Sequence, residues 1–151
     1  MSSAKPKSAI ILLVEDDPDD QDLTKRALEG SKLRNELCIV DNGEHALDYL
    51  FHRGAFADPK TSPRPDLILL DLNLPKLDGR AVLKEIKESP ELRRIPVVIL
   101  STSSQEEDIL RSYDLGVNSY ITKPVRMEGF VNVIRDLERY WFELVVLPDP
   151  G

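Results

Sequence analysis

Side chains that could bind a metal ion and a phosphoryl group follow four short apolar segments of the chain. Asp71 closes one segment, and the acidic pair Glu15 and Asp16 follows another. Ser101 ends a third, and Lys123 stands just after a fourth, directly before a proline. The carboxyl ends of parallel strands meet at one edge of an open α/β sheet, where such sheets bind ligands. Carboxylates, a hydroxyl and a lysine at that edge suit Mg²⁺ or Mn²⁺ and one phosphoryl group.

The elements that must position these side chains alternate between strand and helix. Apolar runs bounded by Pro, Gly, Asn and Asp predict five strands, and amphipathic patterns between them predict five helices. The order predicts an α/β fold of the flavodoxin-like (βα)5 type, doubly wound, with a five-stranded parallel sheet and helices on both faces. The predicted strands cover 10–14, 37–40, 66–71, 96–101 and 119–122, and the predicted helices cover 18–30, 44–51, 80–88, 106–115 and about 130–141.

Composition limits the classes of function. The 151 residues suit one domain, and the net charge of −7 argues against nucleic-acid binding, which needs a basic surface. Cys38 is the single cysteine, which excludes an internal disulfide and favours a reducing compartment. No apolar run reaches the roughly 20 residues of a membrane span, and the polar start does not resemble a signal peptide. We therefore expect a cytoplasmic protein without membrane contact.

The order of the acidic, hydroxyl and lysine residues resembles the receiver domain of two-component response regulators. Two further segments, 100–103 and 141–148, resemble more narrowly the stand-alone regulators paired with bacterial and cyanobacterial phytochromes. The resemblance implies a flexible N-terminus at 1–8, a receiver domain at 9–142 and an apolar C-terminal extension at 143–151. The motifs that carry it are Glu15-Asp16, Asp71, Ser101 and Lys123-Pro124.

The resemblance assigns the acidic residues to a phosphoacceptor and a metal site. Asp71 is implied to attack a phosphohistidine and form an acyl phosphate. Asp16 and Asp71 are implied to bind Mg²⁺ through their side chains, and Asn73 through its backbone carbonyl. Glu15 is implied to lie beside the ion and to contact it through water. The protein then carries out only its own phosphorylation and dephosphorylation, and is not an enzyme with a separate substrate.

The same resemblance assigns a switch and two kinds of partner. The resemblance implies that Lys123 pairs with the phosphoryl oxygens and precedes a cis peptide bond. Ser101 is implied to hydrogen-bond one of these oxygens, and Tyr120 is implied to change its rotamer as part of the same switch. The implied partners are a sensor histidine kinase, of phytochrome type by the narrower match, and a second copy bound through the C-terminal extension. Thr102 departs from the small residue usual in receivers, and the absence of a DNA-binding module implies output through protein contacts.

Other interpretations remain open at the level of sequence. A haloacid-dehalogenase-type phosphatase also uses a strand-end Asp, but needs a second Asp where this chain has Asn73. A flavodoxin-like cofactor binder needs a phosphate-cradling loop where this chain has acidic residues, and a degenerate receiver needs no intact site. Individual residues also have structural alternatives: Asp71 as a turn cap, Asp17 as a helix cap, Glu15 as a solvated side chain, and Tyr120 as a core residue.

Overall fold

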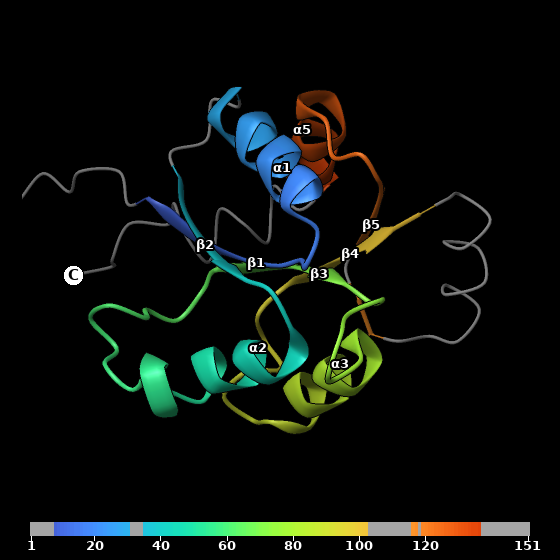
Figure 1. Cartoon of the computed structure of the whole chain (residues 1–151). Helices are drawn as coiled ribbons and strands as arrows, with labels where there is room; N and C mark the ends of the chain where they lie inside the picture. Colours follow the sequence, from blue (N-terminus) through green and yellow to red (C-terminus); the bar gives the residue numbers. More distant parts are fainter. Residues whose placement is uncertain (1–7, 31–34, 103–115, 118, 137–151) are drawn as a thin grey trace, which may run out of the picture.

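The computed structural model describes residues 8–30, 35–102, 116–117 and 119–136. Five parallel strands form one sheet with the order β2-β1-β3-β4-β5. Helices α1 and α5 cover one face, and α2 and α3 cover the other (Figure 1). The predicted flavodoxin-like, doubly wound α/β fold is confirmed. The elements are β1 (Ala9–Val14), α1 (Pro18–Gly30), β2 (Asn35–Val40), α2 (Gly43–Leu50), the 3₁₀ turn η1 (Gly54–Phe56), β3 (Leu67–Asp71), α3 (Gly79–Glu88), β4 (Val97–Ser101), β5 (Ser119–Thr122) and α5 (Met127–Asp136).

Three predicted parts of the chain lie outside the described residues. These are most of the flexible N-terminus, the helix expected at 106–115, and the chain from 137 onward with its apolar extension. Within the described part, no helix combines the length and apolar character needed to span a bilayer.

Several predicted boundaries differ from the structure by one to three residues, and two of them have identifiable reasons. β2 begins at Asn35 rather than Leu37, because parallel pairing with β1 continues through Asn35 opposite Ala9 whatever the polarity of the side chains. α2 begins at Gly43, where the sequence predicted a turn. The Asn42 side chain accepts a hydrogen bond from the His45 N–H at 2.8 Å, so Asn42 is the N-cap of α2.

The start of α1 positions acidic residues above the sheet. Pro18 is its first residue, a position where the missing N–H of proline removes no helical hydrogen bond. Asp17 caps the helix, because its Oδ1 accepts hydrogen bonds from the backbone N–H groups of Asp19 at 2.8 Å and Asp20 at 3.3 Å. The structure thus supports the capping role considered for Asp17.

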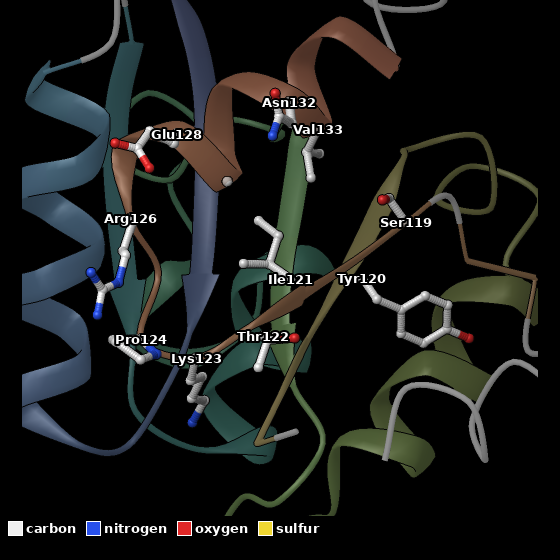
Figure 2. Close-up of a pocket in the computed structure, with 11 residues that line it drawn as sticks. Ser119, Tyr120, Ile121, Thr122, Lys123, Pro124, Arg126, Glu128, Asn132 and Val133 are labelled. Atoms are coloured by element: carbon white, nitrogen blue, oxygen red, sulfur yellow. The ribbon is translucent and has the colours of Figure 1, made fainter. Parts of the chain in front are cut away.

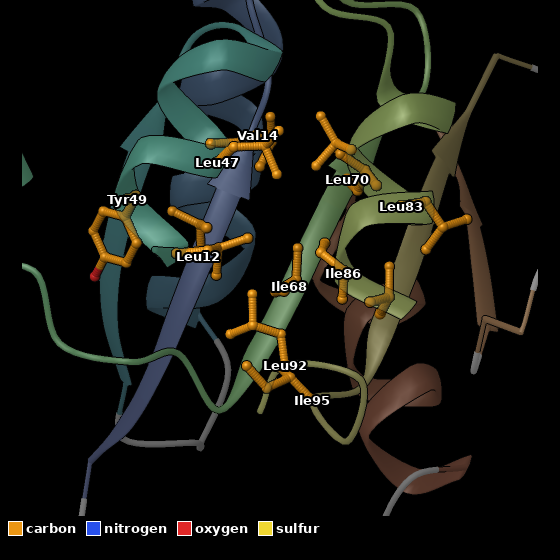
Figure 3. Close-up of a cluster of buried hydrophobic side chains, with 14 of the residues drawn as sticks. Leu12, Val14, Leu47, Tyr49, Ile68, Leu70, Leu83, Ile86, Leu92 and Ile95 are labelled. Atoms are coloured by element: carbon orange, nitrogen blue, oxygen red, sulfur yellow. The ribbon is translucent and has the colours of Figure 1, made fainter. Parts of the chain in front are cut away.

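Alternating side chains along the strands build two separate cores. Leu12, Ile68 and Ile99 lie in the core beneath α2 and α3 (Figure 3). Leu13 follows Leu12 in β1, and Leu69 follows Ile68 in β3. Both lie in the other core, beneath α1 and α5. Because side chains of a strand alternate between faces, the next positions in phase with Leu13 and Leu69 are Glu15 and Asp71. The strand pattern therefore directs both carboxylates toward α1 and α5.

Candidate functional site

The ammonium group of Lys123 contacts carboxylates at the ends of three elements. Lys123 follows β5, and its Nζ lies 2.6 Å from Asp71 Oδ2 at the end of β3 and 2.8 Å from Glu15 Oε1 just after β1. A third carboxylate, Asp20 in the first turn of α1, approaches the same Nζ to 3.5 Å. The Lys123 side chain is only 14% exposed, which reduces solvent screening of these contacts. The structure brings together Glu15, Asp71 and Lys123, as the sequence predicted.

Three carboxylates at this edge could hold a metal ion. Glu15, Asp16 and Asp71 each offer an oxygen, and these oxygens lie within 4.8 Å of one another. Glu15 Oε1 is a buried oxygen that lies 2.8 Å from the Lys123 ammonium. Hard oxygen ligands with a free lone pair in such a cluster fit a divalent cation. The acidic cluster therefore fits divalent metal binding, with Asp16 as its exposed member.

Burial opposes the charge of Glu15. Its side chain is fully buried, and this burial raises the pKa of Glu15 to about 7, although the hydrogen-bonding ammonium of Lys123 acts in the opposite direction. Burial alone would lower the pKa of Lys123, but hydrogen bonds to Asp71 and Glu15 outweigh it and raise that pKa. The lysine therefore stays charged. The alternative of a solvated Glu15 was wrong, because β1 carries this residue beneath the helices.

Both carboxylate oxygens of Asp71 are engaged. Oδ1 accepts a hydrogen bond from the Asn73 N–H at 2.9 Å, and Oδ2 accepts one from Lys123 at 2.6 Å. Asp71 thus caps the turn that follows β3 as well as contacting the lysine, so the structural and chemical interpretations of this residue are compatible. The proposed ligand role of the Asn73 carbonyl stays a prediction.

Of the two residues assigned to the switch, Ser101 contacts the backbone of Lys123 and Tyr120 packs against the core. Ser101 is buried at the end of β4, its Oγ donates to the Ile121 carbonyl at 3.5 Å, and its own carbonyl accepts from the Lys123 N–H at 2.7 Å. The peptide bond between Lys123 and Pro124 is cis, as predicted. Tyr120 is half-buried against the core beneath α2 and α3, and in Figure 2 its ring points away from Lys123. The structure thus places Tyr120 in the core position that was its alternative, and its switch role stays a prediction.

A hollow of about 540 Å³ runs beside this site. β5, α5 and the segment between them line it, with Lys123 at one end (Figure 2). The hollow therefore connects the surface of the β5 and α5 edge with the lysine that contacts Asp71.

Two residues of the site were missed in the sequence. Asp20 contacts Lys123, and the Gln21 side chain donates to the Glu15 carbonyl at 2.6 Å. Both belong to the first turns of α1, whose acidic start was visible in the sequence as Asp19 and Asp20. The helical period could have placed Asp20 and Thr24, which is buried, on one face of α1, and so could have directed Asp20 toward the sheet.

The sequence of residues 11–135 matches the family described as the response regulator receiver domain. The fold, the acidic edge and this match agree, and the chain belongs to that family.

The relatives narrow the class. Response regulator Rcp1 of Synechocystis sp. is 45% identical over 148 residues, which cover 98% of this chain and 99% of Rcp1. The bacteriophytochrome response regulator RtBRR has a TM-score of 0.83 and 48% identity, covering 95% of this chain and 84% of RtBRR. The phosphorylated cyanobacterial phytochrome response regulator RcpA has a TM-score of 0.72 and 47% identity, covering 94% of this chain and 99% of RcpA. This chain is thus a receiver domain of the phytochrome response regulator type.

A metal-bound relative supports the interpretation of the acidic cluster. The Mn²⁺-bound form of Rcp1 has a TM-score of 0.70 and 46% identity, covering 93% of this chain and 99% of that structure. Together with the Glu15, Asp16 and Asp71 cluster, it supports a divalent cation at this edge of the sheet.

Proposed function

We propose that this protein accepts a phosphoryl group from a sensor histidine kinase on Asp71, with Mg²⁺ as the bound cation. The observation that carries the proposal is the buried carboxylate of Asp71, held 2.6 Å from the Lys123 ammonium within the acidic cluster. Asp16 and Asp71 would hold the ion through their side chains, Glu15 would lie beside it, and Asn73 would add its carbonyl. A bound Mg²⁺ would supply positive charge to the carboxylates and the incoming phosphoryl group.

Asp71, Lys123 and Ser101 have different roles in the proposed transfer. A carboxylate oxygen of Asp71 attacks the phosphorus, the new bond joins Asp71 to the phosphoryl group, and the bond from phosphorus to the kinase imidazole breaks. The electron pair of that bond stays on the imidazole nitrogen. Lys123 moves from Asp71 to the phosphoryl oxygens and balances part of their charge, and the Ser101 hydroxyl donates to one of them.

The proposal describes a signalling protein and not an enzyme with a separate substrate. Asp71 itself is consumed as the acceptor, and hydrolysis of its acyl phosphate restores it. Thr102 follows the switch residue and is exposed, so its branched side chain narrows the approach to the phosphoryl site.

The partners belong to the same proposal. The similarity to phytochrome response regulators supports a phytochrome-type kinase as the donor. A homodimer through residues 143–151 is proposed from the apolar side chains of that segment. The net charge of −7 argues against nucleic acid as a partner. We place the protein in the cytoplasm, where its kinase would act on it, and expect its output to run through protein contacts.

Acetyl phosphate with Mg²⁺, followed by intact mass spectrometry, tests the proposal. We expect the wild-type chain to gain one stable phosphoryl group, Asp71→Asn to gain none, and Asp48→Asn to behave as wild type, because Asp48 pairs with Arg53 away from the site. Steady release of free phosphate without a labelled protein would instead favour the phosphatase class. Full labelling of Asp71→Asn would show that another residue is the acceptor.

A further inference from the structure

The partners of Lys123 fall into two kinds. Asp71 and Glu15, at 2.6 and 2.8 Å, also belong to the acidic cluster that fits a divalent cation. Asp20, at 3.5 Å, contacts the same ammonium but lies outside that cluster of three. An ammonium and a divalent cation compete for the same oxygens on Asp71 and Glu15, whereas the Asp20 contact does not involve the cluster.

Asp20 is held in place independently of Lys123. Its N–H donates to the capping Asp17 side chain at 3.3 Å, and its carbonyl accepts from the hydroxyl of the buried Thr24 at 2.8 Å. Its side chain is only 26% exposed. The two hydrogen bonds order the backbone of Asp20, so only its side-chain torsions remain to be ordered when the partly shielded carboxylate attracts the ammonium.

We infer that Asp20 is a positioning residue for Lys123. Asp20 gives the ammonium a carboxylate outside the metal cluster, so that the ammonium can leave Asp71 without leaving the site. With Asp20 present, part of the lysine charge is balanced from the α1 side. The ammonium then competes less strongly with a divalent cation for the oxygens of Asp71 and Glu15. Without Asp20, the ammonium is held by the cluster alone. The reaction-related part of this inference rests on the proposed function, but the competition with a cation does not.

Asp19 provides a matched control. It is the preceding carboxylate in the same helical turn and is exposed, and its side chain leaves α1 about 100° away from that of Asp20. Asp19→Asn therefore removes the same charge from the same helix end without removing the contact at 3.5 Å. Asp20→Glu keeps the charge and serves as the conservative variant.

The experiment combines these variants with Lys123→Ala in the full chain. Mn²⁺ affinity is measured by calorimetry, Asp71 labelling by acetyl phosphate is followed by intact mass, and circular dichroism checks folding. We expect Asp20→Asn to weaken Mn²⁺ binding and to slow labelling about two- to fivefold more than Asp19→Asn does, which is the size of a partly screened charge pair. Asp20→Glu should recover most of this loss.

The Lys123→Ala background decides whether Asp20 acts through the lysine. There, Asp20→Asn and Asp19→Asn should weaken Mn²⁺ binding equally, because the ammonium that distinguishes them is gone. Equal effects in the presence of Lys123 would overturn the inference, as would an excess effect of Asp20→Asn that persists in Lys123→Ala. A wild-type chain that gains no phosphoryl group would overturn the proposed function instead, and the Mn²⁺ titrations would still decide the role of Asp20.

Discussion

Glu15 carries a charge that its surroundings oppose. Its backbone continues β1, with its N–H donating to the Val40 carbonyl at 3.0 Å, so the side chain cannot turn to water without breaking the end of the sheet. Burial is the largest effect on its carboxyl group and raises its pKa to about 7, while Lys123 only partly offsets this effect. A divalent cation at the cluster would favour the ionised form. The residue therefore links protonation, metal binding and stability.

The pKa of Glu15 predicts a specific pH dependence of stability. Because the native pKa lies above that of an unfolded chain, the native state binds more protons between about pH 4.5 and pH 7. The contribution of Glu15 to the free energy of unfolding is therefore fully present below this window and falls as pH rises through about 7. Glu15→Gln should gain roughly 1–3 kcal/mol relative to wild type between pH 5 and pH 8, measured by urea unfolding with a chelator present.

The two histidines, His45 and His52, are common to both proteins, so the difference between variant and wild type isolates Glu15. Saturating Mg²⁺ should shrink the pH-dependent difference, because the cation favours the charged carboxylate. A difference that stays constant from pH 5 to pH 8 in the absence of metal would contradict a raised pKa at Glu15.

At the scale of elements, the loop after β3 must approach the start of α3 closely. Gly79, the first residue of α3, donates to the Leu72 carbonyl at 3.0 Å, and a methyl group at Gly79 would lie 2.5 Å from Leu72 Cα and closer still to the Asp71 carbonyl oxygen. The neighbouring atoms are backbone and cannot rotate away. The absence of a side chain at Gly79 is therefore what lets α3 begin directly beside Asp71.

Gly79→Ala should destabilise the fold, whereas the same change at Gly129 should stabilise it. At Gly79 we expect a loss of roughly 2–4 kcal/mol, because either α3 or the end of β3 must shift. A methyl group at Gly129, inside α5, would meet Ile121 at an ordinary 3.9 Å, so alanine should add about 0.5–1 kcal/mol through helix propensity. Urea unfolding of both variants measures the two effects. Equal stability of Gly79→Ala and wild type would show that the loop has another low-energy conformation.

Elements with a strong local pattern were predictable, and contacts that depend on helix orientation were not. The continuous apolar runs of β3 and β4 and the proline at the start of α1 placed Asp71, Ser101 and the acidic loop at one edge from the sequence alone. The contact between Asp20 and Lys123 depends on how α1 rotates over the sheet, which hydrophobic spacing defines only coarsely. The burial of Glu15 depends on the sheet continuing past the last apolar residue of β1. Local patterns indicate the face on which each residue lies, but the contact itself and the depth of burial are tertiary effects.

At the scale of the molecule, the acidic edge should couple metal binding to folding. The carboxylates of Glu15, Asp16 and Asp71 share one region, and Lys123 contacts two of them. The remaining repulsion is relieved when a cation binds, and a cation that binds only the native state raises its apparent stability. Mg²⁺ should therefore raise the melting temperature of the whole domain.

Asp16→Asn should change the metal-free stability and the stabilisation by Mg²⁺ in opposite directions. Loss of one carboxylate should raise the melting temperature in the presence of a chelator and weaken the stabilisation that Mg²⁺ produces. Differential scanning calorimetry across a series of Mg²⁺ concentrations measures both quantities, and Asp17→Glu serves as a control that keeps the charge of the neighbouring cap. An unchanged response of Asp16→Asn to Mg²⁺ would remove Asp16 from the set of ligands.

The surface of α5 bears on the predicted dimer. Met127 is 45% exposed and Val131 is 36% exposed, and their spacing of four residues puts them on one side of the helix. The sequence that follows α5 is rich in apolar residues, and an apolar segment of this kind is typical of an interaction surface. The apolar residues of this segment are Trp141, Phe142, Leu144, Val145, Val146 and Leu147.

We predict that the C-terminal segment, together with this side of α5, forms the interface of a two-fold homodimer. A two-fold interface uses the same patch on both subunits, so each substitution acts twice. Light scattering on the full chain, on a chain ending at Arg139 and on Val131→Glu measures the association, with circular dichroism to confirm folding. The truncated chain should be monomeric, and Val131→Glu should weaken the dimer at least about tenfold because it buries an unpaired charge in each subunit. If the truncated chain is folded and dimerises as tightly as the full chain, the interface lies elsewhere. If the full chain is monomeric at high micromolar concentration, with and without acetyl phosphate, the dimer is refuted.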